Sequence, residues 1–223
     1  MWFAIIIMLA LGYYIHKKNK AKTQNPSVNL DNFLRILRDE NMQNRSYPDF
    51  LQKRVLRGAD IDSFSNTMED FGRTPDNPIP VNGYLGEIVY LSLLKSPEGK
   101  HLIFHRLGAL NGIDVYETVS LDGTHWDILY FSMYHPRRSR KAPLDYSLLD
   151  SNQPFLLLGT NLYLPEFPHG LRQAIMELTI NILGMPMYPP IIREIEEQNN
   201  FVRPAEHCTT LSKVRQMLTS SQS

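Results

Sequence analysis

The chain has few of the features that most often reveal a function. Only one of its 223 residues, Cys208, is a cysteine, so neither an intramolecular disulfide nor a zinc site with several cysteines can form within one chain. It has no GxGxxG or Walker phosphate loop, no HExxH metal motif and no GxSxG nucleophile elbow. No cofactor is therefore implied by a motif, and the lone thiol agrees with a reducing cytoplasm.

Net charge is also absent, because 23 basic residues balance 23 acidic ones and the formal net charge is +0. Domains built to bind nucleic acid usually carry a strong basic excess, so we do not expect a nucleic-acid partner. The chain beyond its N-terminal segment has roughly 200 residues, which suits one domain with a substantial core.

Charge is missing locally as well, from all of Met1–Ile15, and four lysines follow between positions 17 and 22. As a helix, the uncharged segment is about 22 Å long, shorter than a bilayer core of about 30 Å. Trp2 at one end and Tyr13 and Tyr14 at the other suit the two membrane interfaces. We expect an uncleaved transmembrane anchor.

Two other interpretations of this segment remain. A cleaved signal peptide has an apolar run of similar length, but it carries positive charge before the run and small residues after it, the reverse of the order here. A buried core helix is disfavoured, because a polar stretch follows the segment and leaves it no obvious neighbour.

The lysines set the expected orientation, since positive flanks remain cytoplasmic. We expect the N-terminus outside and the C-terminal domain in the cytoplasm. The predicted division is an anchor at residues 1–16, a basic and polar linker at 17–29 and a single soluble α+β domain at 30–223. Membrane lipid is an expected partner through residues 1–16, and a protein is the other. The oligomeric state is left open.

Apolar side chains at helical spacing predict several helices. One runs from Leu30 to about Asn41 with Asn29 as its cap, and another runs from Pro48 to Leu56 and stops near Gly58. Further helices are expected at residues 171–182, at 190–198 and near the C-terminus, where Thr209 or Thr210 would be the cap and Leu211, Val214 and Leu218 the apolar side.

The middle of the chain predicts strands at residues 87–94, 101–106, 113–120, 125–133 and 155–158. A turn at Ser96–Gly99 would join the first two strands, and the three prolines between Arg73 and Gly83 predict an extended connection. Together the elements predict an α+β fold, with an antiparallel β-sheet built from hairpins and helices packed on one side of it.

Asp122-Gly123 is a strong hairpin signal. A two-residue loop there fixes the register of the flanking strands. One face would then carry apolar side chains and Glu117 and meet the core, while the other would be polar near the turn. The predicted pairs are Val119 with Trp126, Thr118 with Asp127, Glu117 with Ile128, Tyr116 with Leu129, and Val115 with Tyr130.

Candidate chemistry surrounds this hairpin. His125 and Asp127 share a predicted strand face, His135 follows the end of that strand, and His101 and His105 share a face of the preceding hairpin. Imidazoles and a carboxylate can bind a divalent metal or act as general acid and base. The alternative is that these histidines make ordinary hydrogen bonds at the sheet, because no spacing among them is diagnostic.

A short basic run lies between Pro136 and Pro143. Arginine side chains bind phosphate and carboxylate groups well, so this run is a candidate site for a lipid headgroup, a phosphorylated ligand or an acidic protein. The alternative is a solvated loop. The run consists of Arg137, Arg138, Arg140 and Lys141.

Two classes of function fit these observations. The first is a membrane-anchored protein with a cytoplasmic binding or assembly domain. The second is a membrane-tethered hydrolase that uses the histidines and Asp127, with or without a metal, on a phosphorylated or polar substrate. The lack of a catalytic motif favours the first.

Overall fold

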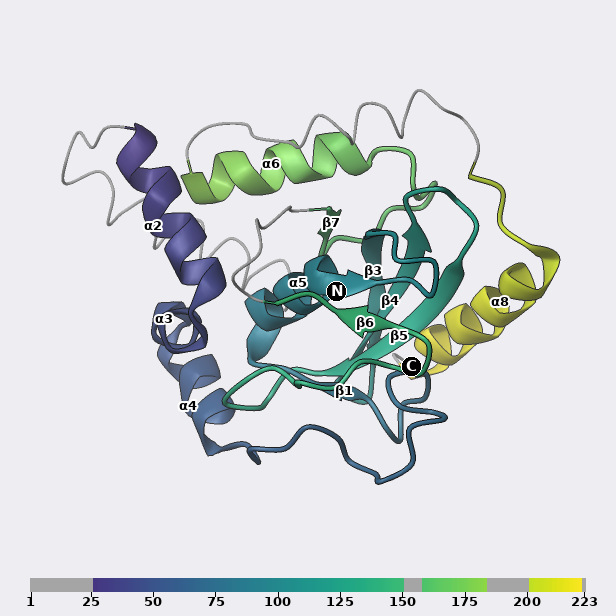
Figure 1. Cartoon of the computed structure of the whole chain (residues 1–223), viewed down its shortest axis with the longest axis horizontal. Helices are drawn as coiled ribbons and strands as arrows, with labels where there is room; N and C mark the ends of the chain where they lie inside the picture. Colours follow the sequence, from purple (N-terminus) through teal and green to yellow (C-terminus); the bar gives the residue numbers. More distant parts are fainter. Residues whose placement is uncertain (1–25, 151–157, 184–200, 222–223) are drawn as a thin grey trace.

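The computed structural model describes residues 26–150, 158–183 and 201–221, and its fold is mixed α+β (Figure 1). A five-stranded sheet has the order β1-β5-β4-β3-β7. Its centre is an antiparallel meander, and the short edge strands β1 and β7 pair in parallel with β5 and β3. The sheet is therefore mixed, not antiparallel as predicted. Its strands are β1 (Ile79–Pro80), β3 (Leu102–Leu110), β4 (Ile113–Ser120), β5 (Trp126–Ser132) and β7 (Gly159–Thr160).

The β4–β5 hairpin confirms the predicted register. Val119 pairs with Trp126, and the ladder continues in step to Val115 and Tyr130. The loop itself is longer than predicted, because Leu121 donates its N–H to the carbonyl of His101, at 2.9 Å. Five residues, 121–125, connect the strands, and the register is kept because the same pairs remain opposite one another.

Residues 87–94 were predicted as a strand, and this prediction is wrong. Residues 87–93 belong to helix α5 (Gly83–Leu93), in which ten residues are buried, and of the predicted strand only Leu94 lies in a strand. An apolar run of this length fits a buried strand as well as a buried helix, and a helix buried on all sides has no polar face to reveal its period. The strand β3 that follows the Ser96–Gly99 turn pairs instead with β4 and β7.

Helices cover both faces of the sheet, not one side as predicted. On one face, Tyr116, Leu129 and Phe131 pack with α5 residues such as Ile88 and Leu91. On the other face, side chains of β4 and β5 pack against α8 (Ala205–Ser220). The face that packs against α8 is apolar and meets a core, as predicted. The face that packs against α5 is also buried, except at its polar end near the turn.

Helix α6 (Leu171–Leu183) confirms the helix predicted at 171–182 and runs beside the edge strand β7 (Figure 1). Leu171 and Ile175 pack with Ile103 and Val119 of the sheet. Leu158, the last residue of the strand predicted at 155–158, is fully buried just before β7. Residues 155–157 and the helix predicted at 190–198 lie outside the described residues.

The N-terminal part forms three helices: α2 (Pro26–Arg38), α3 (Glu40–Ser46) and α4 (Asp49–Arg57). One helix was predicted for 30–41, but Asp39 divides it, because its backbone is extended and its carboxylate caps α3 by accepting from the N–H of Asn41, at 2.8 Å, and of Met42. Asn29 is not a cap but lies within α2. The helix predicted after Pro48 is confirmed as α4, and Gly58 ends it.

Helix α8 begins at Ala205, four residues before Thr209 and five before Thr210, the two predicted caps. Pro204 precedes its first turn, and the hydroxyls of Thr209 and Thr210 donate to carbonyls one turn back inside the helix. The predicted apolar side is confirmed, with Leu211, Val214 and Leu218 buried. A small antiparallel pair completes the fold, made of β2 (Leu94–Lys95) and β6 (Ser147–Leu148).

Within the described ranges, no helix is both long and apolar enough to cross a bilayer. The predicted anchor at residues 1–16 lies outside these ranges.

Candidate functional site

Two of the predicted site residues meet at one end of β5. His125 precedes the strand and Asp127 lies within it, so the pleat points both side chains to the same face. Tyr146, from the segment before β6, lies between them: its hydroxyl is 2.9 Å from His125 Nε2 and 3.1 Å from Asp127 Oδ2. Arg73 Nε donates to the same Asp127 oxygen, at 3.0 Å.

The protons of this His125–Tyr146–Asp127 relay can be placed by elimination. Ionised Asp127 only accepts hydrogen bonds, so the single hydroxyl proton of Tyr146 goes to it. The Tyr146 oxygen then accepts from His125 Nε2–H. Burial raises the pKa of Tyr146, and the charge of Asp127 raises it further, so the tyrosine keeps its proton. The relay orients one imidazole through a carboxylate, an arrangement that suits general acid–base chemistry.

The other candidate histidines lie elsewhere. His135 is buried beyond the end of β5, where its Nδ1–H donates to the carbonyl of Ala59, at 2.8 Å, and its Nε2 lies 3.0 Å from Ser132 Oγ. Burial lowers the pKa of His135. His105 is buried on the opposite face of the sheet, beside Glu117. The structure therefore brings together His125 and Asp127 but neither His105 nor His135.

Glu117 on β4 is fully buried and is the centre of a second cluster. Its carboxylate accepts from His105 Nε2 at 2.9 Å, from His207 Nε2 at 3.0 Å and from Arg203 Nε at 2.6 Å. Burial alone would raise the pKa of Glu117, but the hydrogen bonds from the two histidines and Arg203 outweigh it and lower the pKa. Glu117 therefore fastens α8 and the segment before it to the sheet.

The tautomer of His105 follows from its neighbours. The backbone N–H of Leu164 donates to His105 Nδ1, at 3.0 Å, so the proton is on Nε2 and points at Glu117. The ring stacks on Phe167, with 4.3 Å between centroids. Burial lowers the pKa of His105 in spite of Glu117, which keeps this imidazole neutral.

A third polar cluster joins α5 to the sheet. Glu87 and Asp114 are both buried, the Tyr116 hydroxyl donates to Glu87 Oε2 at 2.9 Å, and Arg106 donates to Asp114. Burial raises the pKa of Glu87 well above its usual range, and the neighbouring Asp114 raises it further. The raised pKa favours the protonated form of Glu87, the form in which its carboxyl group can donate a hydrogen bond toward Asp114.

The basic loop, residues 136–141, is tied to the rest of the chain by its own charges. Arg137 pairs with Asp60 and Asp62, the latter at 2.7 Å, and Arg140 pairs with Glu40 at 3.0 Å. Arg138 is only 3% exposed and contacts Glu40 and Gln43. Lys141 Nζ donates to Ser63 Oγ, at 2.9 Å. These side chains, predicted to bind an anion, hold partners within the chain.

Metal ligation was the other chemistry considered for the histidines. Within the described residues, no group of three or more histidine, cysteine and acidic side chains is arranged to hold a metal. His105 and His207 do share the Glu117 carboxylate, but Arg203 donates to both of its oxygens. A cation there would face the guanidinium, so the cluster does not suit a metal.

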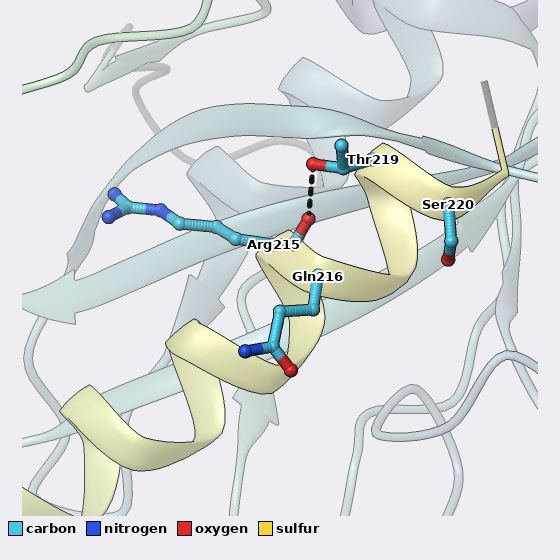
Figure 2. A pocket seen from close by; sticks show the side chains of 4 residues that line it. All are labelled: Arg215, Gln216, Thr219 and Ser220. Atoms are coloured by element: carbon cyan, nitrogen blue, oxygen red, sulfur yellow. Dashed lines mark hydrogen bonds between the residues drawn. The ribbon is translucent and has the colours of Figure 1, made fainter. Parts of the chain in front are cut away.

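A hollow lies beside the last turns of α8 (Figure 2). Its lining residues are Arg215, Gln216, Thr219 and Ser220. The Thr219 hydroxyl donates to the Arg215 carbonyl of its own helix, at 2.9 Å. All four residues come from one helix and none belongs to the clusters above.

No protein-family model, no curated protein and no solved structure matches the chain.

Several members of these clusters were missed from the sequence, and one had a detectable signal. Glu117 was the single charge on an otherwise apolar strand face, and a buried charge requires partners. Its partners Arg203 and His207 come from a distant segment, so only the fold identifies them. Tyr146 and Arg73 likewise join the relay from connecting segments, where neither has a periodic pattern.

Proposed function

We propose that this chain is a single-pass membrane-anchored protein whose α+β domain binds a protein partner at the cytoplasmic face. The anchor rests on the uncharged residues 1–15 and the lysines that follow them. The binding role rests on one observation about the domain. Hydrogen bonds and ion pairs hold the basic loop, residues 136–141, against three other parts of the fold.

The basic loop joins three separate parts of the fold. Asn44 of α3 donates to the Pro136 carbonyl, at 2.7 Å, and Ser139 donates its N–H to the Pro80 carbonyl of β1, at 2.8 Å. Asp62, after α4, accepts from Arg137. A surface fixed in this way loses little conformational freedom when a partner binds, which favours affinity. Polar and charged side chains such as Asn44, Asp62 and Arg137 therefore hold the basic loop in a fixed position.

The proposal is tested with the full chain in its own membranes. A reporter fused to the C-terminus, active on only one side of the membrane, is expected to report the cytoplasm. In-membrane cross-linking is expected to recover a protein in fixed proportion to the chain. A reporter active on the outer side rejects the topology. Recovery of the same proteins by the anchor fused to an unrelated domain rejects the binding role.

A matched pair of variants links binding to the fixed loops. Asp62→Asn removes one of the two carboxylates that pair with Arg137 and is expected to lower the recovered partner protein several-fold, while the chain stays in the membrane. Glu206→Gln changes the same amount of charge on the exposed first turn of α8 and is expected to leave recovery unchanged. Equal recovery from both variants contradicts the role of the loop.

A membrane-tethered hydrolase is the second candidate, and the His125–Tyr146–Asp127 relay favours it. In this version His125 acts as the general acid or base, oriented through Tyr146. Positioned proton transfer contributes about 10²–10⁴-fold to a rate, so His125→Ala should abolish most turnover of chromogenic phosphate esters, and Tyr146→Phe should lower it. If the wild-type chain turns over these phosphate esters no faster than His125→Ala does, the hydrolase candidate is rejected.

A further inference from the structure

Helix α4 exposes two large apolar side chains. Phe50 and Leu56 are each 55% exposed, whereas Leu51 and Val55 on the same helix are buried against the domain. Single exposed apolar residues are normal on a protein surface. Two on one nine-residue helix, both turned away from the core, call for an explanation.

The same exposed side of α4 is basic. At 100° per residue, Lys53, Arg57 and Asp49 project between Phe50 and Leu56, and all five are exposed, so two basic residues against one acidic residue leave this side with a net positive charge. Lys53 and Arg57 appear in no ion pair of the described structure, whereas Arg54 lies over the Tyr134 ring at 3.6 Å. Over Pro26–Arg57 the chain has six basic and four acidic residues. Apolar side chains interspersed with lysine and arginine suit an anionic interface.

We propose that the exposed side of α4, made of Phe50, Lys53, Leu56 and Arg57, rests on the anionic surface of the bilayer that holds the anchor. This inference depends on the membrane anchor proposed above. Phe50 and Leu56 sit at headgroup depth, and Lys53 and Arg57 meet lipid phosphates. The anchor then fixes the distance of the domain from the membrane and α4 fixes its orientation.

The position of α4 in the chain fits this contact. Nine residues separate position 16 from Pro26, and they span at most about 30 Å when extended. The helices α2, α3 and α4 follow one another along one flank of the molecule, on the left in Figure 1, and α8 lies on the opposite flank. The flank that carries α4 is therefore the one that the anchor joins.

The basic loop fits this role less well, although it holds four basic residues. Arg137 and Arg140 are paired with Asp60, Asp62 and Glu40, and Arg138 is buried. Their charge is neutralised within the domain and would reach lipid phosphates only by breaking these pairs. Lys53 and Arg57 meet the membrane with no such loss.

The test places a fluorophore on each flank of the full chain, reconstituted in vesicles that contain a nitroxide-labelled lipid. Exposed Cys208 is first replaced by serine. One label goes on Asp49→Cys in α4 and the control label on Ser212→Cys in α8, and both positions are exposed. We expect strong quenching at position 49 in phosphatidylserine vesicles, weak quenching there in phosphatidylcholine vesicles, and weak quenching at position 212 in both.

Charge variants give the decisive comparison. The double variant Lys53→Gln and Arg57→Gln is expected to lower the docked-to-free ratio on the order of tenfold or more, because each basic residue near an anionic surface contributes separately. Phe50→Ser with Leu56→Ser should also weaken quenching. The matched control, Lys213→Gln with Arg215→Gln on α8, should have no effect.

Each remaining outcome rejects a defined part of the proposal. If the chain floats with the vesicles but position 49 is quenched no more than position 212, docking is wrong and the anchor stands. If the label at position 49 becomes shielded from solvent only as the protein-to-lipid ratio rises, a second copy of the chain covers α4 and lipid docking is again wrong. If the chain does not float with the vesicles, the proposed anchor itself fails.

Discussion

The two faces of strand β4 show how buried carboxyl groups acquire pKa shifts of opposite direction. Its pleat points Asp114 and Tyr116 at α5 and Glu117 at α8. Glu117 meets a guanidinium and two imidazole N–H groups, which stabilise its charge. Glu87 of α5 lies beside another carboxyl group, and burial together with that neighbour raises its pKa. Burial is nearly complete for both, so their hydrogen-bond partners decide the charge.

Replacing Glu117 by glutamine should destabilise the fold strongly. Glu117→Gln removes the charge that Arg203, His105 and His207 satisfy, and breaking a buried pair costs about 3 kcal/mol. Denaturant unfolding monitored by circular dichroism measures the loss. Glu206→Gln, on the exposed first turn of α8, should cost under about 1 kcal/mol. Equal losses in the two variants would show that the cluster around Glu117 adds nothing.

The pH dependence of this contribution has a definite sign. The folded-state pKa of Glu117 is lowered, so its stabilisation is fully present above the unfolded pKa of about 4.3 and declines as the pH falls below that value. His105, whose folded-state pKa is lowered, adds a loss that begins as the pH falls through about 6.5. In Glu117→Gln, the loss below about pH 4.3 should be smaller.

Replacing Glu87 by glutamine should be tolerated. In Glu87→Gln the amide oxygen can accept from Tyr116 and the amide nitrogen can donate toward Asp114, so the change in unfolding free energy should stay within about 1 kcal/mol. Glu87→Ala leaves Tyr116 and Asp114 without these partners and should cost about 2–4 kcal/mol. Denaturant titrations of the wild type and both variants measure these differences.

The pH dependence distinguishes a neutral Glu87 from an ionised one. Its folded-state pKa is raised, so the unfolded chain releases this proton first, and stability should decline as the pH rises above about 4.3 toward the folded value. Glu87→Gln should lack that decline. If its stability follows the same pH curve as the wild type, Glu87 is not the group that titrates.

At the scale of elements, local rules predicted some parts of the fold and missed others. The β4–β5 hairpin was predictable because an Asp-Gly turn and alternation of period two fix its register within twenty residues. Helix α5 was not, because burial on every side leaves it no polar face. The shared face of His125 and Asp127 followed from strand geometry, but Tyr146 and Arg73 reach them only through the tertiary fold.

The edge strand β7 should depend on the absence of a side chain at Gly159. A Cβ built there would overlap the ring of Phe104, which is fully buried and cannot move aside. Gly159→Ala should therefore lower the unfolding free energy by about 3 kcal/mol through overpacking.

Gly112→Ala is the matched control for that substitution. Nothing lies within 4 Å of a Cβ at Gly112, so only its positive φ of 86° opposes the change, at about 1 kcal/mol. Thermal unfolding of the two variants gives the comparison. A loss at Gly159 no larger than at Gly112 would mean that the Phe104 ring has room to shift.

At the scale of the whole molecule, one buried arginine links the N-terminal helices to the sheet. Arg138 follows β5 and is only 3% exposed, and its Nη1 donates to Gln43 of α3, at 3.2 Å. Its Nη2 lies 3.4 Å from Glu40, and its backbone N–H donates to the same carboxylate. Arg140 contacts Glu40 as well, at 3.0 Å, but its side chain is 58% exposed. The two arginines therefore share a partner and differ in burial.

This difference predicts how the helical flank comes loose. Arg138→Ala leaves Glu40 without its buried partner and Gln43 Oε1 with Asn82 alone, and it should cost about 3 kcal/mol, whereas Arg140→Ala removes an exposed pair and should cost at most about 1 kcal/mol. Hydrogen exchange should accelerate in α2–α4 of Arg138→Ala ahead of the β3–β5 meander, because the lost contact joins those helices to the sheet. If all amides accelerate together, the helices and the sheet unfold as one unit, and Arg138 stabilises the whole domain instead of the joint between them.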